Sequence, residues 1–411
     1  KMKKINRIGL LINWAREIDM YSSLISTIPK NKLQIITNDL SDTAIIRQNN
    51  LKYIEKGLKK KKLKFKKLSQ IKNKFNYKVL ISTGETGAKT YNFISIIKFL
   101  YFHTIGKVIK FIKLNKIFIL FFNRPFTCSG SQNIYIQSFI EKSISQITIK
   151  FPWTMDLNYK SYPDNRWEKN YDIFFTHGKL DSKLIKKKFF KPKVFRIGYP
   201  RYDNLKINSH SAKKKIKKLF GIKNKKKIIF WIPTHIDTKN EVGTNIISWM
   251  EKIKKLQKNY NIIIRPHTKT LNYNKRLFHL LKENGFLVDN ESDRKIGELF
   301  KGSDLVFADY GGSIFSSIYM LKPMLLLNLP KNTDYVIDKN FNKTFDIQLR
   351  NKLISFNLHD KRQDFISTIE KLLTKNEANK IKRIKNYFFG KKNNKNQVLK
   401  TKKYLLDLLK K

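Results

Sequence analysis

The sequence predicts an α/β protein built from two Rossmann-like domains. Its 411 residues are enough for two domains of ordinary size, each with its own hydrophobic core. Short apolar runs with strand character alternate with helical stretches through roughly the first 200 residues, and the alternation starts again near residue 227. Such alternation is typical of parallel sheets that helices cover on both faces.

The predicted strands of the first half are short and rich in Ile, Val and Phe. Segments that read as helix or loop separate most of them, so a parallel arrangement is expected. The strands are residues 8–12, 33–37, 78–82, 117–122, 147–151, 172–176 and 194–197.

The second half repeats the pattern and ends in helices. Its predicted strands are residues 227–232, 261–264, 286–288, 304–308 and 324–329. Its predicted helices are residues 244–258, 275–284, 296–300, 314–321, 360–373, 378–389 and 398–409. We expect an N-terminal domain over 1–210, a nucleotide-donor domain over 211–375, and helices over 376–411 that pack back across the junction. The polar, lysine-rich residues 208–218 are a candidate linker between the domains.

The formal net charge of +55 is extreme, but its distribution argues against a dedicated nucleic-acid binder. Lysine is scattered through every segment beside abundant Asn and Ile, a pattern that codon bias toward A and T would leave. Nucleic-acid-binding proteins concentrate their charge on one face or tail. We therefore expect no nucleic-acid partner, although a basic surface favours nucleotide phosphates, phosphopolymers or an anionic bilayer.

The single cysteine, Cys128, excludes an internal disulfide and a cysteine-based zinc site, as expected in a reducing compartment. The N-terminal residues lack the features of a signal peptide, and no run reaches the roughly 20 apolar residues that span a bilayer. Residues 92–113 read as a basic amphipathic helix, either buried in the first domain or lying in a membrane interface. Residues 56–67 read as a solvated basic face. The expected location is cytoplasmic, with peripheral binding to the inner face of the membrane as an option.

Residues 304–330 read as strand, turn, helix and strand. Gly311 and Gly312 let the backbone approach a ligand closely, and Ser313 is a good N-cap for the helix that follows. The free N–H groups and the positive dipole end of that helix suit a diphosphate. An ordinary βα turn with a capping serine explains the same residues equally well.

Polar residues follow three predicted strands of the second half. Thr234 and His235 follow the first, Arg265 and His267 the second, and Asp309 the third. Ligands of open α/β sheets bind at the carboxyl ends of the strands, so these loops are expected to line one crevice. Arg265 and His267 suit a diphosphate leaving group; the alternatives are an ion pair for Arg265, a structural role for His267 and an exposed loop position for His235.

Several short motifs occur together, in a fixed order, between about residues 172 and 330. They are Gly198-Tyr199-Pro200-Arg201-Tyr202-Asp203-Asn204-Leu205, Ile232-Pro233-Thr234, Arg265-Pro266-His267, Glu298-Leu299, Ser303-Asp304-Leu305-Val306, Asp309-Tyr310 and Lys322-Pro323. In these the chain resembles the CDP-glycerol glycerophosphotransferases of teichoic acid and capsule synthesis. The resemblance implies a GT-B fold, in which two Rossmann-like domains face a central cleft.

The chain departs from the family pattern at two places. Gly311 and Gly312 stand where the family usually has two serines, although backbone N–H groups still serve a phosphate there. The family also carries Trp-His-Gly in its first domain, where its His is a candidate general base. Thr176-His177-Gly178 is the nearest match here, and Glu85 follows an early strand, so the candidate bases are His177 and Glu85.

The resemblance implies a transferase that moves a glycerol phosphate, or a related polyol phosphate, from a CDP-linked donor to a hydroxyl of a surface polymer or a lipid-linked acceptor. Donor binding is expected from Thr234, His235, Arg265, His267, Asp309, Gly311, Gly312 and Ser313. A GT-B glycosyltransferase using a nucleotide sugar is the alternative, and a non-catalytic nucleic-acid or membrane binder is a third. No metal-ligand spacing or dinucleotide motif is present, so we expect no metal and no cofactor.

Overall fold

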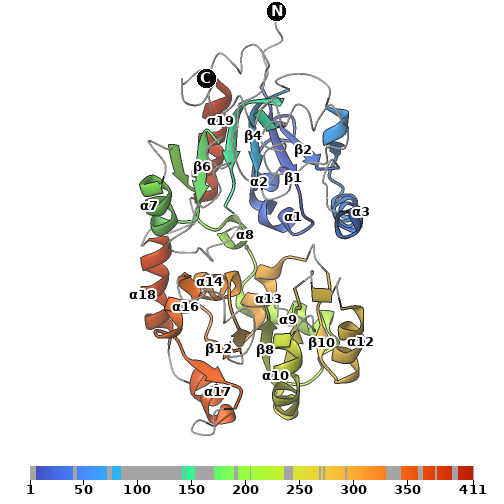
Figure 1. The fold of residues 1–411 in the computed structure, drawn as a ribbon, viewed down its shortest axis with the longest axis vertical. Helices are drawn as coiled ribbons and strands as arrows, with labels where there is room; N and C mark the ends of the chain where they lie inside the picture. Colours follow the sequence, from blue (N-terminus) through green and yellow to red (C-terminus); the bar gives the residue numbers. More distant parts are fainter. Residues whose placement is uncertain are drawn as a thin grey trace, which may run out of the picture. The chain divides into compact units, whose positions relative to one another are not determined.

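We describe the fold from a computed structural model of the chain (Figure 1). The described residues are 6–39, 44–71, 76–84, 141–142, 144–152, 171–188, 193–203, 205–235, 244–267, 270–271, 274–291, 294–329, 344–359, 364–374, 377–390 and 397–410. They form two compact units. The first unit takes the described residues up to 203 together with the C-terminal helix, and the second takes those between 205 and 390.

The strands of the first unit form a parallel sheet in the order β3-β2-β1-β4-β5-β6-β7. Ile8 in the central strand pairs with Leu33 on one side and with Val79 on the other. The strands are β1 (Ile8–Ile12), β2 (Leu33–Thr37), β3 (Phe65–Lys67), β4 (Tyr77–Ser82), β5 (Ser145–Lys150), β6 (Ile173–Thr176) and β7 (Lys193–Arg196). The predicted strands agree with these within about two residues, except that β3 was missed and residues 117–122 lie outside the described residues.

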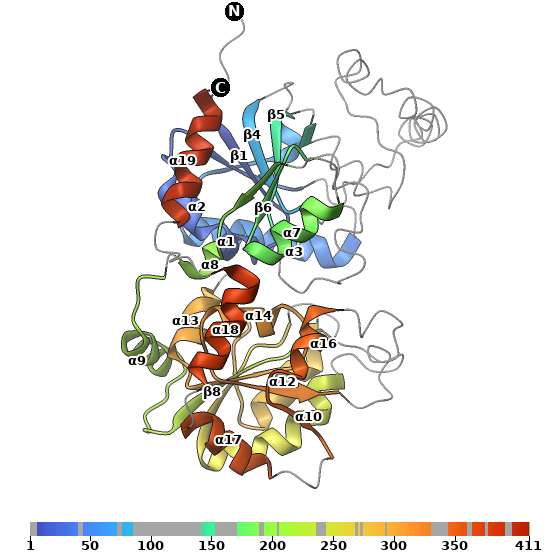
Figure 2. The same ribbon diagram turned by 90° about the vertical axis from the view of Figure 1, so that its left-hand side faces the viewer.

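The helices of the first unit include the last element of the chain. They are α1 (Glu17–Met20), α2 (Ser22–Thr27), α3 (Ala44–Lys60), α7 (Lys179–Lys188), α8 (Pro200–Asp203) and α19 (Gln397–Lys410), with a 3-10 turn, η1 (Leu68–Gln70). Figures 1 and 2 show the red helix α19 beside the blue helix α2, which it contacts. Leu405 of α19 and Leu24 of α2 are buried in one core with Ile8 and Leu10.

The strands of the second unit form a parallel sheet in the order β10-β9-β8-β11-β12-β13. They are β8 (Lys227–Ile232), β9 (Tyr260–Ile264), β10 (Leu287–Val288), β11 (Leu305–Ala308), β12 (Met324–Asn328) and β13 (Ser355–Asn357). The strand β13 was not predicted, because three residues give almost no periodic signal.

Helices cover the sheet of the second unit. They are α9 (Ser209–Leu219), α10 (Thr244–Lys254), η3 (Lys255–Lys258), α12 (Lys275–Glu283), α13 (Ile296–Gly302), α14 (Gly312–Tyr319), α16 (Phe345–Arg350), α17 (Phe365–Thr374) and α18 (Ala378–Phe389). Trp231 packs in the core that holds α10, α12 and α17. Its neighbour Phe230 meets Phe300 of α13, with ring centroids 5.2 Å apart, as the alternation of side chains along a strand requires.

The segment at 208–218 is a helix, and its interpretation as a linker was wrong. Asn208 caps α9 by accepting a hydrogen bond from the Ser211 N–H at 2.8 Å. Ile216 is buried against α13, where a Cβ on Gly302 would lie only 2.5 Å from Ile216 Cδ1. Because lysines fill the solvent side of the helix, its amphipathic pattern was not recognised in the sequence. The chain enters the second unit earlier, between residues 203 and 205.

The C-terminal helices divide between the two units. Helix α18 contacts α14 in the second unit, and α19 belongs to the first. The boundaries at 210/211 and 375/376 stay a prediction, and residues 92–113 lie outside the described residues.

The burial of Lys322 is expected to make the stability of the second unit depend on pH. Its ammonium donates to the Lys301 carbonyl at 2.9 Å and to the Ser303 carbonyl at 2.7 Å, at the end of α13. Burial lowers the pKa of Lys322 to about 8. The folded state therefore releases this proton before the unfolded state does, and the free energy of unfolding should rise between about pH 8 and pH 10.5. We expect the gain to be on the order of 3 kcal/mol.

Urea unfolding of the wild type and of Lys322→Met across this pH range checks the expectation. The variant should lose the rise, whereas a Lys227→Met control at an exposed position should keep it. Equal pH profiles for wild type and Lys322→Met would contradict it.

Candidate functional site

The candidate site of the second unit lies at the carboxyl ends of β8, β9 and β11. These strands are neighbours, and the strand order reverses between β8 and β11. Ligands of open α/β sheets bind at such a reversal. The loops that begin at Pro233, Arg265 and Asp309 follow these three strands. The structure thus brings the three predicted loops to one end of one sheet.

Asp309 holds two of these loops together. Its carboxylate is only 2% exposed and accepts hydrogen bonds from the Thr234 N–H at 2.9 Å and the Tyr310 N–H at 2.7 Å. The side-chain amide of Asn245 donates to the same carboxylate and, at 3.0 Å, to the Thr234 carbonyl. Burial raises the pKa of Asp309, and the hydrogen bonds from Thr234, Asn245 and Tyr310 oppose that shift. Asp309 therefore fixes the shape of the loops through backbone groups.

The turn before α14 differs from the expectation. Gly311 is the N-cap, with a φ of 74° that favours glycine, and Ser313 lies inside the first turn, so the prediction of Ser313 as N-cap was wrong. The Gly311 N–H donates to Asp346 Oδ2 at 2.8 Å. Gly312 and Ser313 are half-buried in the first turn. A carboxylate thus lies at the glycine turn where the sequence predicted a diphosphate.

Arg350 was missed by the sequence analysis. Its guanidinium donates to the carbonyl oxygen of Asp309, to the Leu327 carbonyl at 2.9 Å and to Asn328 Oδ1 at 2.7 Å. It also lies 4.0 Å from the centroid of the Tyr310 ring, within range of a cation–π contact. Arg350 therefore joins the ends of β11 and β12 and places a positive charge next to Asp309 and Tyr310.

Two histidines lie next to one another at the ends of β8 and β9. The ring centroids of His235 and His267 are 5.8 Å apart. His235 Nδ1 shares a hydrogen bond with the buried Thr270 hydroxyl at 2.8 Å, which orients its ring. Both histidines are half-buried, so this pair is the imidazole-rich part of the site.

Arg265 is held by a carboxylate and a backbone carbonyl on the β10 side. Its Nη1 donates to Asp289 Oδ2 at 3.0 Å, and its Nη2 donates to the Glu291 carbonyl at 3.1 Å. Asp289 is buried and also pairs with Arg294 at 2.7 Å. Arg294 also pairs with the Glu291 carboxylate at 3.3 Å, so two carboxylates face two guanidinium groups at this corner of the site.

His177 lies in the first unit, directly after β6. Its side chain is 2% exposed, and its ring centroid lies 4.3 Å from that of Tyr199. Its backbone N–H donates to Asp181 Oδ2 at 2.6 Å, and its Nδ1 lies 3.5 Å from the same oxygen. The Asp181 carboxylate therefore lies next to the ring. Glu85 lies outside the described residues.

A second polar cluster, which the sequence analysis missed, lies at the strand reversal of the first unit. The order reverses between β1 and β4, and Glu17 is fully buried there. Glu17 accepts from the Asn13 N–H at 2.7 Å and the Thr83 hydroxyl at 2.8 Å. Asn38 donates to Asn13 Oδ1 at 2.8 Å, and Lys150 donates to the Thr83 carbonyl. The available signal was that Asn13, Asn38 and Thr83 each follow a predicted strand.

The described residues contain no cluster of three or more His, Cys, Asp or Glu side chains that could hold a metal ion. Among the helices that these residues form, none combines the length and the apolar character that crossing a bilayer requires.

The family to which the chain belongs follows from a match to a protein-family model. Residues 146–403 match the model of the family described as CDP-Glycerol:Poly(glycerophosphate) glycerophosphotransferase. The chain belongs to this family. The matched segment contains the whole site of the second unit and His177, and it begins after β4. Membership in the family confirms the resemblance stated from the motifs.

Individual relatives agree with the family. A teichoic acid poly(glycerol phosphate) polymerase of Bacillus spizizenii is 28% identical over 162 residues, which are 38% of this chain and 40% of the relative. The match therefore spans less than half the length of that curated relative.

Solved structures show the same fold. The wall teichoic acid polymerase TagF, solved as a variant soaked with CDPG, has a TM-score of 0.57 at 14% identity, over 99% of this chain and 90% of that one. The S. aureus protein MnaA, solved with UDP, has a TM-score of 0.53 at 12% identity, over 99% and 98%. The predicted α/β fold with two Rossmann-like domains of the GT-B class is confirmed.

Proposed function

We propose that this protein transfers a glycerol phosphate, or a related polyol phosphate, from a CDP-linked donor to a hydroxyl group of a cell-surface polymer. The supporting observation is the convergence of the β8, β9 and β11 loops at the strand reversal of the second unit, inside the segment that matches the family. A reversal of this kind suits a nucleotide. The histidines, Arg265 and the start of α14 suit its two phosphates.

The reaction exchanges a phosphoanhydride bond of the donor for a phosphodiester bond of the product. An acceptor hydroxyl oxygen attacks the phosphorus that carries the glycerol, the bond from that phosphorus to the bridging oxygen breaks, and CMP leaves with the bonding electrons. The acceptor hydroxyl gives up its proton to a base. Negative charge develops on the phosphate of the leaving CMP, so fixed positive groups beside it lower the barrier.

The second unit supplies those positive groups. His235 and His267, side by side, would contact the leaving phosphate, and Arg265 would add charge from the β9 side. The N–H groups of Gly311, Gly312 and Ser313 would bind phosphate oxygens, with Asp346 giving up the Gly311 N–H when the donor binds. Asp309 and Arg350 would hold the turn in place. Thr234 lies in the loop after β8, where its N–H donates to Asp309.

The first unit supplies the base in this proposal. His177 accepts the proton of the acceptor hydroxyl, and Asp181 lies 3.5 Å from its Nδ1. Glu85 is the other sequence-based candidate. The acceptor is a lipid-linked polymer, and the protein works in the cytoplasm at the inner face of the membrane.

A thermal-shift comparison of donors tests the function. CDP-glycerol at 100 times its Kd should stabilise the protein by about 2.7 kcal/mol, whereas UDP-sugars should not. His267→Ala should weaken CDP-glycerol binding about 10-fold or more, because it removes a charged hydrogen-bond donor. His279→Ala, on the exposed side of α12, is the matched control and should bind normally.

Turnover completes the test, because binding alone does not establish transfer. With a polymer acceptor, CMP should be released in step with polymer growth. Release of UDP from a nucleotide sugar, without a response to CDP-glycerol, would replace this proposal with the glycosyltransferase alternative.

A further inference from the structure

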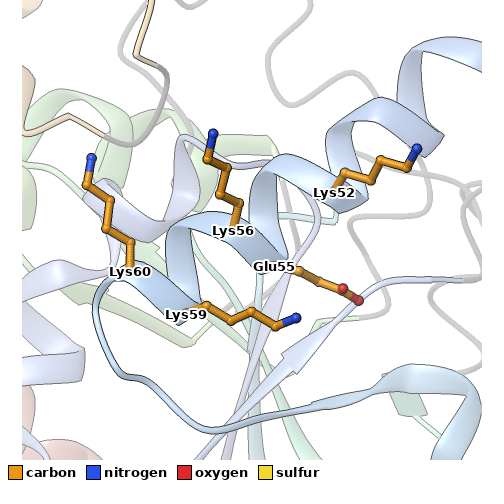
Figure 3. Close-up of a pocket in the computed structure, with 5 residues that line it drawn as sticks. All are labelled: Lys52, Glu55, Lys56, Lys59 and Lys60. Atoms are coloured by element: carbon orange, nitrogen blue, oxygen red, sulfur yellow. The ribbon is translucent and has the colours of Figure 1, made fainter.

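Basic side chains are too common in this chain to mark a particular surface. Figure 3 shows a shallow depression on α3 that is lined by Lys52, Glu55, Lys56, Lys59 and Lys60. Residues 213–227 carry nine lysines and no acidic residue, so the lysines of α3 are not unusual. Acidic residues are scarcer, 31 against 86 Lys and Arg, and a buried one needs a physical explanation.

The buried carboxylates of the described residues are well compensated, with one exception. Asp19 and Asp289 are paired with arginines. At least two hydrogen bonds reach each of a second group, which is Glu17, Glu141, Asp181 and Asp309. Such compensation is expected, because burying an ionised carboxylate costs free energy unless the charge is paired or hydrogen-bonded. The exception is Asp346.

Asp346 is 1% exposed and lies in the first turn of α16. Among the described residues it accepts one hydrogen bond, from the Gly311 N–H at 2.8 Å, and forms no ion pair. Arg350 of the same helix donates instead to the carbonyl oxygens of Asp309 and Leu327. Because an ionised carboxylate can accept about four hydrogen bonds, most of the acceptor capacity of Asp346 is left for another donor.

The Asp346 carboxylate lies at the start of α14, which belongs to the proposed donor site. Helix α16 contacts α14, and Gly311 is the N-cap of α14. No side chain caps α14 at this end, so its first N–H groups suit the diphosphate of a nucleotide donor. A diphosphate bound there would place its two substituents beside Asp346.

The chemistry of the donor indicates which group a carboxylate would hold. A carboxylate repels the phosphates themselves, so its ligand is a hydrogen-bond donor close to them. In CDP-glycerol, the ribose and the glycerol each carry a vicinal pair of hydroxyls and each is attached to one phosphate, whereas the cytosine amine lies beyond the ribose. In dinucleotide-binding Rossmann folds, an acidic side chain accepts a hydrogen bond from a ribose hydroxyl. A vicinal diol can donate to both oxygens of one carboxylate.

We propose that Asp346 binds a vicinal diol of the nucleotide donor and thereby contributes to the choice of donor. The inference rests on the proposed function for the position of the diphosphate. When the donor binds, a phosphate oxygen accepts from the Gly311 N–H, and the diol hydroxyls donate to the carboxylate that this N–H has released. Asp346 thus exchanges one hydrogen bond within the protein for hydrogen bonds to the donor.

The test measures, by isothermal titration calorimetry, how well each protein distinguishes ligands with and without a diol. The ligands are CDP-glycerol, the propyl ester of CDP, which lacks the two hydroxyls of the glycerol, and the 2′,3′-dideoxycytidine form of CDP-glycerol. The proteins are the wild type, Asp346→Ala and the matched control Asp364→Ala. Asp364 also accepts a backbone N–H, that of Ser367 at 2.6 Å, but at an exposed helix start. Figures 1 and 2 show that helix, α17, at the opposite end of the second unit from α14.

The wild type and Asp364→Ala should bind one of the two diol-free ligands about 10-fold or more weakly than CDP-glycerol, because hydrogen bonds to a charged group are lost. Asp346→Ala should bind that ligand and CDP-glycerol equally well. The ligand that shows the effect identifies the ribose or the glycerol as the source of the diol. Removing the carboxylate also frees the Gly311 N–H for phosphate, which changes the affinity for all three ligands alike, so the ratio between ligands is the informative quantity.

The variant Asp346→Asn keeps an acceptor for the Gly311 N–H and serves if Asp346→Ala does not fold. It should reduce the preference for the diol, because a neutral amide oxygen is a weaker acceptor than a carboxylate. The same preference in the wild type and in the Asp346 variants would overturn the proposal, since Asp346 would then only stabilise the turn before α14.

Uridine ligands separate this inference from the proposed function. A wild type that ignores CDP-glycerol, but uses Asp346 to bind UDP more tightly than 2′,3′-dideoxy-UDP, would refute the proposed function alone. A wild type that binds CDP-glycerol with no preference for a diol, or with one that Asp346→Ala leaves intact, would refute the diol contact alone. A wild type that binds neither nucleotide would refute both.

Discussion

Replacing Asp309 by alanine should lower the free energy of unfolding of the second unit by about 3–5 kcal/mol. The substitution leaves the N–H groups of Thr234 and Tyr310 and the side-chain amide of Asn245 without their acceptor. These donors lie at a buried position, where water replaces a lost partner poorly. The β8 and β11 loops should separate, so binding of CDP-glycerol should be lost as well.

Two further variants show whether the hydrogen bonds are responsible. Asp309→Asn keeps one oxygen for Thr234 and Tyr310, so it should cost less than Asp309→Ala. Asp364→Ala removes a carboxylate that accepts from the Ser367 N–H at 2.6 Å at an exposed helix start, and it should cost only about 1 kcal/mol. Urea unfolding measures all three. The account fails if Asp309→Ala is no more harmful than Asp364→Ala.

The second large effect concerns a buried ion pair in the first unit. Arg201 Nε lies 3.0 Å from Asp19 Oδ2, and Asp19 is 2% exposed. Arg201 also donates to the Arg16 carbonyl at 3.4 Å, so it fastens α8 to α1 just before the chain crosses to the second unit. Arg201→Ala and Asp19→Ala should each lower the free energy of unfolding by about 3–5 kcal/mol, because each leaves the other charged group buried without its partner.

The double variant is the decisive measurement for this pair. Asp19→Ala with Arg201→Ala should cost clearly less than the sum of the single changes, because no unpaired charge remains. The surface pair of exposed Lys380 and half-buried Glu377, 3.9 Å apart, is the control, and its cycle should give less than about 1 kcal/mol. Additive costs at Asp19 and Arg201 would show that the two residues do not act as a pair.

Both predictions concern motifs that the sequence analysis valued for other reasons. Asp309 was expected to contact the donor, and the structure places its carboxylate on backbone N–H groups of two loops. Residues 198–205 carry the family resemblance, and the structure shows Arg201 and Tyr199 packed against α1 and His177. The donor-binding roles of the predicted site residues stay a prediction, which the CDP-glycerol experiment tests.

Some errors of the sequence analysis have a common cause. The helix α9 was read as a linker, since its buried residues, Ala212 and Ile216, are few among many lysines. The strand β3 was read as a solvated face for the same reason. Where lysines are this frequent, too few apolar residues remain to show the periodic spacing of a helix or a strand in the sequence. Only packing against a neighbouring element then reveals the structure.

The sequence by itself determined most of the strands, their parallel alternation with helices and the polar loops after β8, β9 and β11. Each of these depends on a pattern only a few residues long, as at Lys227–Ile232, which the structure reproduces with the same bounds. The tertiary structure alone decided which groups meet. Asp309 accepts a hydrogen bond from the Thr234 N–H, 75 residues away in the sequence, and the Gly311 N–H donates to Asp346, 35 residues away. Such partners are fixed by strand order and close packing, which no local pattern encodes.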